Sequence, residues 1–268
     1  MAYALQSAPA GHYRLKHVVR SEVLKVLTLR STAITVTITV VAALLVTGLV
    51  SNSSLHHNPS YYIGFDPTQS SLIGLIVAGL TGGVFGALLI TGEYSSGTVR
   101  ASLAATPRRS VLLAAKVGVA ATAVLAFCEL LSFASFFLGQ AVLSAGGAPS
   151  ASLGSPGALR AVMMTGAFIG LMALMSFGFG LIIRSSAGAI AAFAGVVFVL
   201  PLVMHGISEP ALRYVPTYIL TNSVMSTVNQ GTGGIVQPLA PTVGLVLMAA
   251  YAAAALAAGA VLFVRRDA

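Results

Sequence analysis

The sequence predicts an all-α membrane protein, a polytopic bundle of six transmembrane helices. Three observations support this: an apolar composition, long runs without charge, and basic residues confined to alternate connections. Of the 268 residues, 57% are hydrophobic and 7% are charged, whereas soluble domains carry about 25% charged residues. No charged residue occurs at 31–65 or 67–92. Both runs exceed the roughly 20 apolar residues that cross a bilayer core.

Six apolar segments define the expected spans: 33–50, 71–91, 111–143, 161–183, 187–204 and 242–264. The third is longer than one span requires. It is therefore either strongly tilted, or its first turns, which include Lys116, extend into the cytoplasm. Pro201 lies late in the fifth segment and should kink or end that helix. The backbone groups that it frees must then be satisfied by neighbouring residues or by water.

Small residues recur four positions apart within the spans. The pairs are Gly79 and Gly83, Gly82 and Gly86, and Gly166 and Gly170. This spacing lets helices approach closely, so we expect these glycines to mark helix packing.

The distribution of Lys and Arg predicts the orientation. With both termini in the cytoplasm, only Arg160 and Arg213 lie outside. The cytoplasmic side then holds the other twelve: Arg14, Lys16, Arg20, Lys25, Arg30, Arg100, Arg108, Arg109, Lys116, Arg184, Arg265 and Arg266. We therefore expect a multi-pass protein of a bacterial cytoplasmic membrane, whose first span is an uncleaved signal-anchor. The net charge of +8 is spread over the ends of the spans and forms no contiguous stripe, which argues against nucleic-acid binding.

Residues 12–30 are expected to form an interfacial helix before the first span. Apolar residues such as Leu15, Val19 and Val23 recur on one side, and polar residues such as Ser21 and Lys25 on the other. Such a helix lies flat in the membrane interface. The alternative is a soluble stub that only carries positive-inside charge.

Residues 92–110 form the cytoplasmic connection between spans two and three. Ser95 or Ser96 can cap a short helix, Val99 and Leu103 share one face of it, and Pro107 ends it. The alternative is an ordinary basic loop.

Residues 206–241 form the longest outer connection. Its apolar part, 214–228, is too short to span the membrane but can form re-entrant or interfacial helices if protein surrounds it. The glycines and prolines that follow predict a flexible return to the last span.

Catalytic motifs are absent from the sequence. It contains no Gly-rich loop ending in Gly-Lys-Ser or Gly-Lys-Thr, no His-Glu-x-x-His, and no paired aspartates within the spans. We therefore predict no catalytic residue and no metal site. His56 and His57 are interpreted as a solvated pair, and Cys128, the single cysteine, as a buried apolar residue.

Glu129 is the one acidic residue well inside a span, where an ionised group costs roughly 2.5 to 3.5 kcal/mol. It is either a protonated structural group or part of a translocation pathway. Together with Phe133, Met172 and Met175 it forms our set of pathway candidates, since Met and Phe can line an adaptable apolar cavity. Ordinary helix packing is the alternative for the apolar residues.

Two segments resemble the permease subunits of type-2 ABC exporters, particularly the short bacterial ones. Glu22, Lys25 and Arg30, in Ser21-Glu22-x-x-Lys25-x-x-Thr28-x-Arg30, resemble the connecting helix that runs into the first span. The second segment, Glu93-Tyr94-Ser95-Ser96-Gly97-Thr98 followed by Leu103, Pro107, Arg109 and Lys116, resembles the cytoplasmic segment that includes the coupling helix docking on the ATPase subunit. The coupling residues expected from it are Glu93, Ser96, Gly97, Thr98, Val99, Arg100, Leu103, Pro107 and Arg109.

This resemblance implies an exporter of a hydrophobic or amphipathic substrate, such as a drug, antibiotic, peptide or lipid. It implies a separate ABC ATPase that binds ATP and Mg, and a second permease chain, identical or sibling. This chain itself would bind no cofactor. Within the coupling segment, Glu93 and Arg100 either form an ion pair or are both solvated. The competing functions are an ion-coupled secondary transporter or channel, a membrane-embedded enzyme, or a structural subunit of a membrane complex.

Overall fold

The computed structural model describes residues 15–28, 30–56, 62–98, 109–207, 209–227 and 237–266. Its α-helices are α1 (Leu15–Thr28), α2 (Arg30–Ser53), α3 (Pro67–Leu72), α4 (Leu75–Ser95), α6 (Arg109–Ala145), α7 (Ala158–Ile183), α8 (Ser186–Ala194), α9 (Leu200–Ile207), α10 (Pro216–Ile219) and α11 (Pro241–Arg266). Turns of 3-10 helix occur at Ser54–His56 and Glu209–Tyr214, and π-helical turns at Gly195–Val199 and Leu220–Val224. The described ranges contain no strand, which confirms the all-α class.

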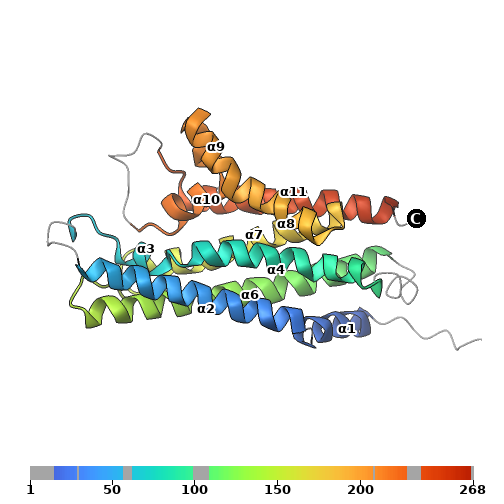
Figure 1. Ribbon diagram of the computed structural model, residues 1–268, viewed down its shortest axis with the longest axis horizontal. Helices are drawn as coiled ribbons and strands as arrows, with labels where there is room; N and C mark the ends of the chain where they lie inside the picture. The colour runs from blue at the N-terminus through green and yellow to red at the C-terminus, as the bar shows by residue number, and fades with distance from the viewer. Residues whose placement is uncertain are drawn as a thin grey trace, which may run out of the picture.

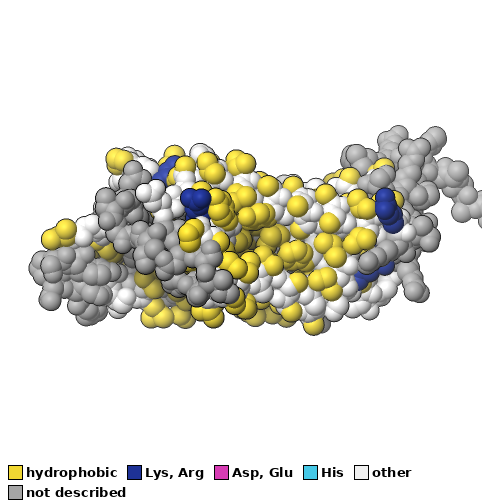
Figure 2. Space-filling view, turned by 90° about the horizontal axis from the view of Figure 1, so that it is seen from above, with side chains coloured by type: hydrophobic (Ala, Val, Ile, Leu, Met, Phe, Trp, Pro, Cys, Tyr) yellow, Lys and Arg dark blue, Asp and Glu magenta, His cyan; other side chains and the backbone are white. Residues whose placement is uncertain are grey.

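Within the described residues, six helical stretches have the length and apolar composition needed to cross a membrane: Ser31–Ser53, Pro67–Ser95, Val111–Ala145, Ala158–Ile183, Ser186–Met204 and Pro241–Arg265. Each contains one predicted span. Figure 2 shows an apolar band along the face in view, with Lys and Arg side chains toward its two ends. The chain is a multi-pass membrane protein by these criteria.

The long helices run side by side along the long axis of the molecule (Figure 1). Helix α7 is central, because it packs against α4, α6 and α11. Its side chains include the fully buried Phe168 and Phe177. Helix α1 and the C-terminal end of α11 lie at one end of the bundle, which we call the α1 end, and α3 and α10 lie toward the opposite, α3 end (Figure 1).

Glycines allow the closest helix contacts in this bundle. A Cβ atom built on Gly86 of α4 would collide with the backbone carbonyl of Ala173 in α7, and one built on Gly166 of α7 would lie 2.8 Å from the Cα atom of Glu129 in α6. Close backbone approach of this kind is how helices associate in lipid, where apolar side chains gain little from leaving the solvent. Both glycines belong to the predicted small-residue pairs, so their expected packing role is confirmed.

The third span belongs to a single helix of 37 residues, α6. Its first turns pack against α1, where Val19 contacts a small cluster made by Leu112 and Ala115. Lys116 lies in this part of the helix. The extra length of the segment is therefore used for contact with the helix that precedes the first span.

The fifth span is interrupted near Pro201, as predicted. A π-helical turn at Gly195–Val199 separates α8 from α9, and Figure 1 shows α9 turning away from the bundle. Pro201 has no N–H to donate to the carbonyl of Val197, four residues earlier. The Thr217 hydroxyl, which follows the fifth span in sequence, donates to that carbonyl instead. This confirms that a neighbouring group satisfies the freed backbone.

The connection after the fifth span is helical and largely buried where it is described. Ile219, Leu220 and Val224 are almost completely buried and belong to the main core. Helix α10 and the π-helical turn after it contact α11, where the side chain of Ile219 occupies the space beside Gly244. This agrees with the expectation of short helices held in place by protein. Of the glycines and prolines expected to form the return, those at 228–236 lie outside the described residues.

Candidate functional site

Four charged side chains from three helices meet at the α1 end of the bundle. Lys116 of α6 donates to Glu22 Oε2 of α1 at 2.8 Å and to Glu93 Oε1 of α4 at 2.5 Å. Lys25 of α1 donates to Glu22 Oε1 at 2.8 Å and lies 3.6 Å from Glu93 Oε1. We call these four residues the charge cluster.

The charge cluster is largely shielded from solvent. Glu22, Glu93 and Lys116 are 4%, 8% and 5% exposed, and Lys25 is half-buried. Two carboxylates and two ammonium groups balance in charge, which is the condition under which buried ions are tolerated. The Oε2 atom of Glu93 has no hydrogen-bond partner among the described residues.

The neighbouring charges shift the pKa values of Glu22 and Lys25, the two members of the charge cluster that lie on α1. Burial raises the pKa of the Glu22 carboxyl, but its attraction to Lys116 and Lys25 outweighs burial and leaves the pKa below its ordinary value. Burial lowers the pKa of the Lys25 ammonium, and its contacts with Glu22 and Glu93 outweigh that effect, so the pKa is raised. Both shifts favour the charged forms at neutral pH.

Helical spacing positions the α1 side of the charge cluster. Glu22 and Lys25 are three residues apart and therefore share one face of α1. That face lies against α6, whereas Val23 and Leu24 are exposed. The expected helix at 12–30 is present as α1. The side of α1 that contacts the bundle carries Glu22 and Val19. Val23, expected on the same apolar side as Val19, points away from the bundle, where the membrane interface would lie.

The serines predicted to cap a short helix in residues 92–110 belong to the end of α4. Helix α4 continues to Ser95, Ser96 is its C-cap, and both hydroxyls donate to the carbonyl of Gly92. After Gly97, Thr98 is helical again, and the rest of the expected short helix lies outside the described residues. Gly97 then adopts the left-handed conformation, with φ of +71°, which commonly ends a helix. The Ser96 and Thr98 hydroxyls lie 3.0 Å apart. Helix α4 thus continues through the polar residues that follow its apolar part and ends just before Gly97.

The centre of the predicted coupling segment lies outside the described residues. This applies to Val99, Arg100, Leu103 and Pro107, and to the side chains of Arg30 and Arg109. The Glu93–Arg100 ion pair is therefore not described. Among the described residues, Glu93 contacts Lys116 and Lys25.

Two contacts at this end were missed by the sequence reasoning. The sequence marks Lys116 as a charge within a long apolar segment and as part of the resemblance. It does not reveal that Lys116 contacts Glu22 and Glu93. The Arg184 guanidinium lies over the ring of Tyr94, 5.4 Å from its centroid, and connects α4 to the turn between spans four and five. Each pair joins residues from different helices, which no local motif reveals.

The pathway candidates lie at separate positions of the bundle. Glu129 lies against α7 at Gly166, and its Oε2 atom has no hydrogen-bond partner among the described residues. Met172 is buried and packs near Gly79 of α4, and Phe133 packs on the main core. Met175 alone of the four lines an apolar cavity of about 540 Å³ between α7, the fifth span and α11.

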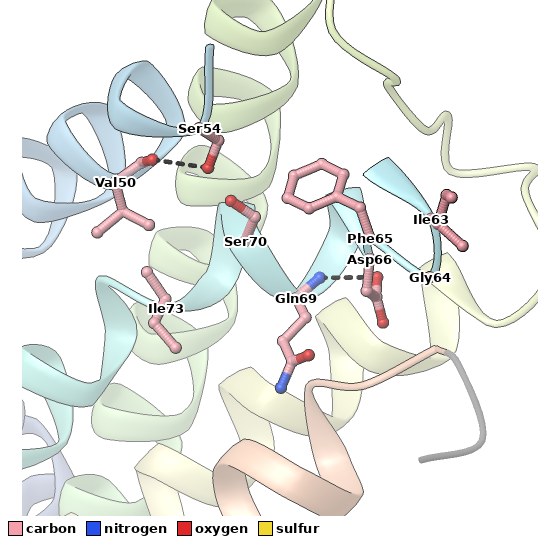
Figure 3. A pocket seen from close by; sticks show the side chains of 9 residues that line it. All are labelled: Val50, Ser54, Ile63, Gly64, Phe65, Asp66, Gln69, Ser70 and Ile73. Carbon is pink, nitrogen blue, oxygen red and sulfur yellow. Dashed lines mark hydrogen bonds between the residues drawn. The ribbon is translucent and has the colours of Figure 1, made fainter. Parts of the chain in front are cut away.

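A polar cluster occupies the α3 end of the bundle. The buried Asp66 caps α3 by accepting from the Gln69 N–H at 3.0 Å, and it accepts from the backbone N–H and hydroxyl of Thr227 at 2.6 and 2.9 Å. Gln69 also donates to the carbonyl of Thr221 at 2.7 Å. A cavity of about 350 Å³ lies beside Asp66, Gln69 and Ser70 (Figure 3). The sequence placed Asp66 in an outer loop, but its partner lies 161 positions away.

No protein-family model matches the chain, and no curated protein matches it in sequence. The described residues bring together no group of three or more His, Cys, Asp or Glu side chains that could hold a metal ion.

Proposed function

We propose that this chain is the membrane-spanning permease subunit of an ATP-driven exporter in a bacterial cytoplasmic membrane, with the α1 end of the bundle on the cytoplasmic side. The observation that carries the proposal is the position of Lys116 between Glu22 and Glu93. It joins the helix before the first span, the end of the second span and the start of the third. These are the elements that flank or adjoin the segment resembling a coupling helix.

The charge cluster joins the start of the coupling segment, 92–110, to the helix that follows it. Glu93 lies at the start of this segment, Lys116 lies after its end, and the two side chains are in direct contact. A force applied to the segment by an ATPase would therefore act on α4 and α6 together. Because Glu22 contacts the same ammonium group, α1 would move with them.

In this function the chemistry of ATP belongs to a partner. The partner ATPase binds ATP and Mg, and its closure moves the segment and rocks the spans between inward- and outward-open states. A second permease chain, identical or sibling, completes the route. The substrate is hydrophobic or amphipathic, in keeping with the apolar lining of the cavity beside Met175.

The proposal is tested by purifying the tagged chain from its native membrane and measuring ATP hydrolysis by the complex. A co-purified protein with a Gly-rich loop ending in Gly-Lys-Ser or Gly-Lys-Thr, whose ATPase activity rises when the chain is added, is expected. Replacing Val99 and Leu103 together by Asp should abolish that stimulation. Ala101→Asp, on the opposite face of the expected helix, is the matched control and should retain it.

Two results would contradict the proposal. One is normal stimulation by the Val99→Asp, Leu103→Asp variant in a complex that still assembles. The other is transport by the isolated chain along an ion gradient with no ATPase present, which would identify an ion-coupled transporter or channel instead.

A further inference from the structure

The apolar cavity of about 540 Å³ lies on one side of the bundle, away from the charge cluster and from Asp66. Its lining comes from α7, from the π-helical turn of the fifth span and the part of that span after it, from the connection that follows, and from α11. Its volume falls within the range of small-molecule sites, which is roughly 300 to 1,000 Å³. Its lining contains no charged side chain.

Small side chains and a bent helix create this space. Ala254, Ala255 and Ala258 line the cavity from α11, where larger residues would fill it. On the facing side, α8 is packed on the bundle and α9 turns away from it (Figure 1). The π-helical turn and Pro201 cause this change of direction, and π-helical turns of this kind are frequent at functional sites.

The cavity is bounded by a hydrogen-bonded contact. The Tyr251 hydroxyl of α11 donates to the carbonyl of Tyr214 at 3.1 Å, and both residues belong to the lining. Tyr214 ends the 3-10 turn Glu209–Tyr214. The Tyr214 carbonyl therefore already has a hydrogen-bond donor within the protein. The rest of the lining is apolar and suits an apolar ligand.

A cation lies at the same boundary. The Arg213 guanidinium stacks on the ring of Tyr214, 4.9 Å from its centroid. Its Nε atom is buried and has no hydrogen-bond partner among the described residues. A guanidinium pairs well with planar or tetrahedral anions, so the ligand is expected to be negative at this end and apolar along the rest.

We propose that this cavity binds a single acyl chain of an anionic membrane phospholipid, with the phosphate of the lipid beside Arg213 and the chain between α9 and α11. The bilayer supplies this amphiphile directly, because the cavity lies among helices that cross the membrane. The site is independent of the ATPase assigned above, since neither the cavity nor Arg213 contacts the charge cluster.

The test uses the purified full chain in phosphatidylcholine nanodiscs that contain a small amount of photoreactive lipid. One sample carries phosphatidylglycerol with a diazirine on the acyl chain, and the other carries phosphatidylcholine with the same chain. After illumination, mass spectrometry locates the label. We expect label on 196–204 and 254–258, at a level several-fold higher with phosphatidylglycerol.

Two variants separate the two halves of the site. Ala254→Phe with Ala258→Phe should remove most of the label, whereas Ala253→Phe with Ala257→Phe, at exposed positions outside the lining on the same helix, should retain it. Arg213→Gln leaves the cavity intact and should equalise labelling by the two lipids. Equal labelling of the filled and control variants, or equal labelling by both lipids in the unmodified chain, would overturn the proposal.

Discussion

Lys116 lies 2.8 Å from Glu22, although 94 positions separate the two residues in sequence. The same ammonium group lies 2.5 Å from Glu93, so one side chain of α6 holds both α1 and α4. Removing it would leave two carboxylates facing each other with the half-buried Lys25 as the remaining cation among the described residues.

Lys116→Met should therefore destabilise the fold by several kcal/mol, because breaking a buried ion pair on one side costs about 3–5 kcal/mol. Cys128 is a natural probe, since it is the only cysteine and is 3% exposed. Heating the protein in detergent with a thiol-reactive dye reports when Cys128 becomes accessible. Lys116→Arg keeps the charge and serves as the control. An unchanged transition in Lys116→Met would show that the charge cluster does not stabilise the bundle.

The docking of α1 should depend on pH at both extremes. The lowered pKa of Glu22 means that its contribution is complete above the ordinary value of about 4.3 and is lost as pH falls through the folded-state value. The raised pKa of Lys25 means that its contribution is complete below the ordinary value of about 10.4 and is lost as pH rises through the folded-state value.

Spin labels at Val23→Cys and Ala114→Cys, in a Cys128→Ala background, measure this docking as a distance distribution. Both positions are exposed. The distribution should be narrow at neutral pH and broaden in acid as Glu22 is protonated. In the Glu22→Gln variant, the distance distributions at neutral and acid pH should differ less than they do in the unmodified protein. A distribution that stays equally narrow down to the pH at which Glu22 is protonated in the folded protein would disprove the assigned role of Glu22.

Thr217→Val should destabilise the fifth span, because it removes the hydroxyl that donates to Val197. An unpaired buried carbonyl costs about 1–3 kcal/mol, and measured values within membranes lie toward the low end. Pro201→Ala restores an N–H near the same carbonyl, so Thr217→Val should cost less in that background. The Cys128 dye assay on the four proteins gives the coupling energy. If the effects of the two substitutions on stability are additive, the N–H restored by Pro201→Ala and the Thr217 hydroxyl do not bond the same carbonyl.

Gly86→Ala should lower the transition temperature sharply, since the new Cβ would collide with the carbonyl of Ala173. Gly118→Ala on α6 is the matched control, because no other atom lies within 4 Å of a Cβ atom placed there. Alanine favours a helix over glycine by about 0.8–1.0 kcal/mol, so the control should be unchanged or slightly stabilised. Similar effects of the two substitutions would contradict the close approach of α4 and α7.

The spans and the early helix could be predicted because each depends on residues that are close in sequence. Apolar run length alone defined six membrane-length helices, and Pro201 marked the interruption in the fifth. The charge cluster could not be predicted in the same way. Whether Glu93 meets Arg100 or Lys116 depends on the rotation of α4 and the register of α6 against it. The same limit applies to Asp66, whose partner Thr227 follows four further spans.

The bond between Thr217 and Val197 also has a consequence for biosynthesis. The ribosome adds residue 197 before residue 217, so the fifth span is made before the hydroxyl that donates to its Val197 carbonyl. That carbonyl acquires this donor only when the next 20 residues have been made. We therefore expect the fifth span to reach its final packing only after the segment that follows it has folded back.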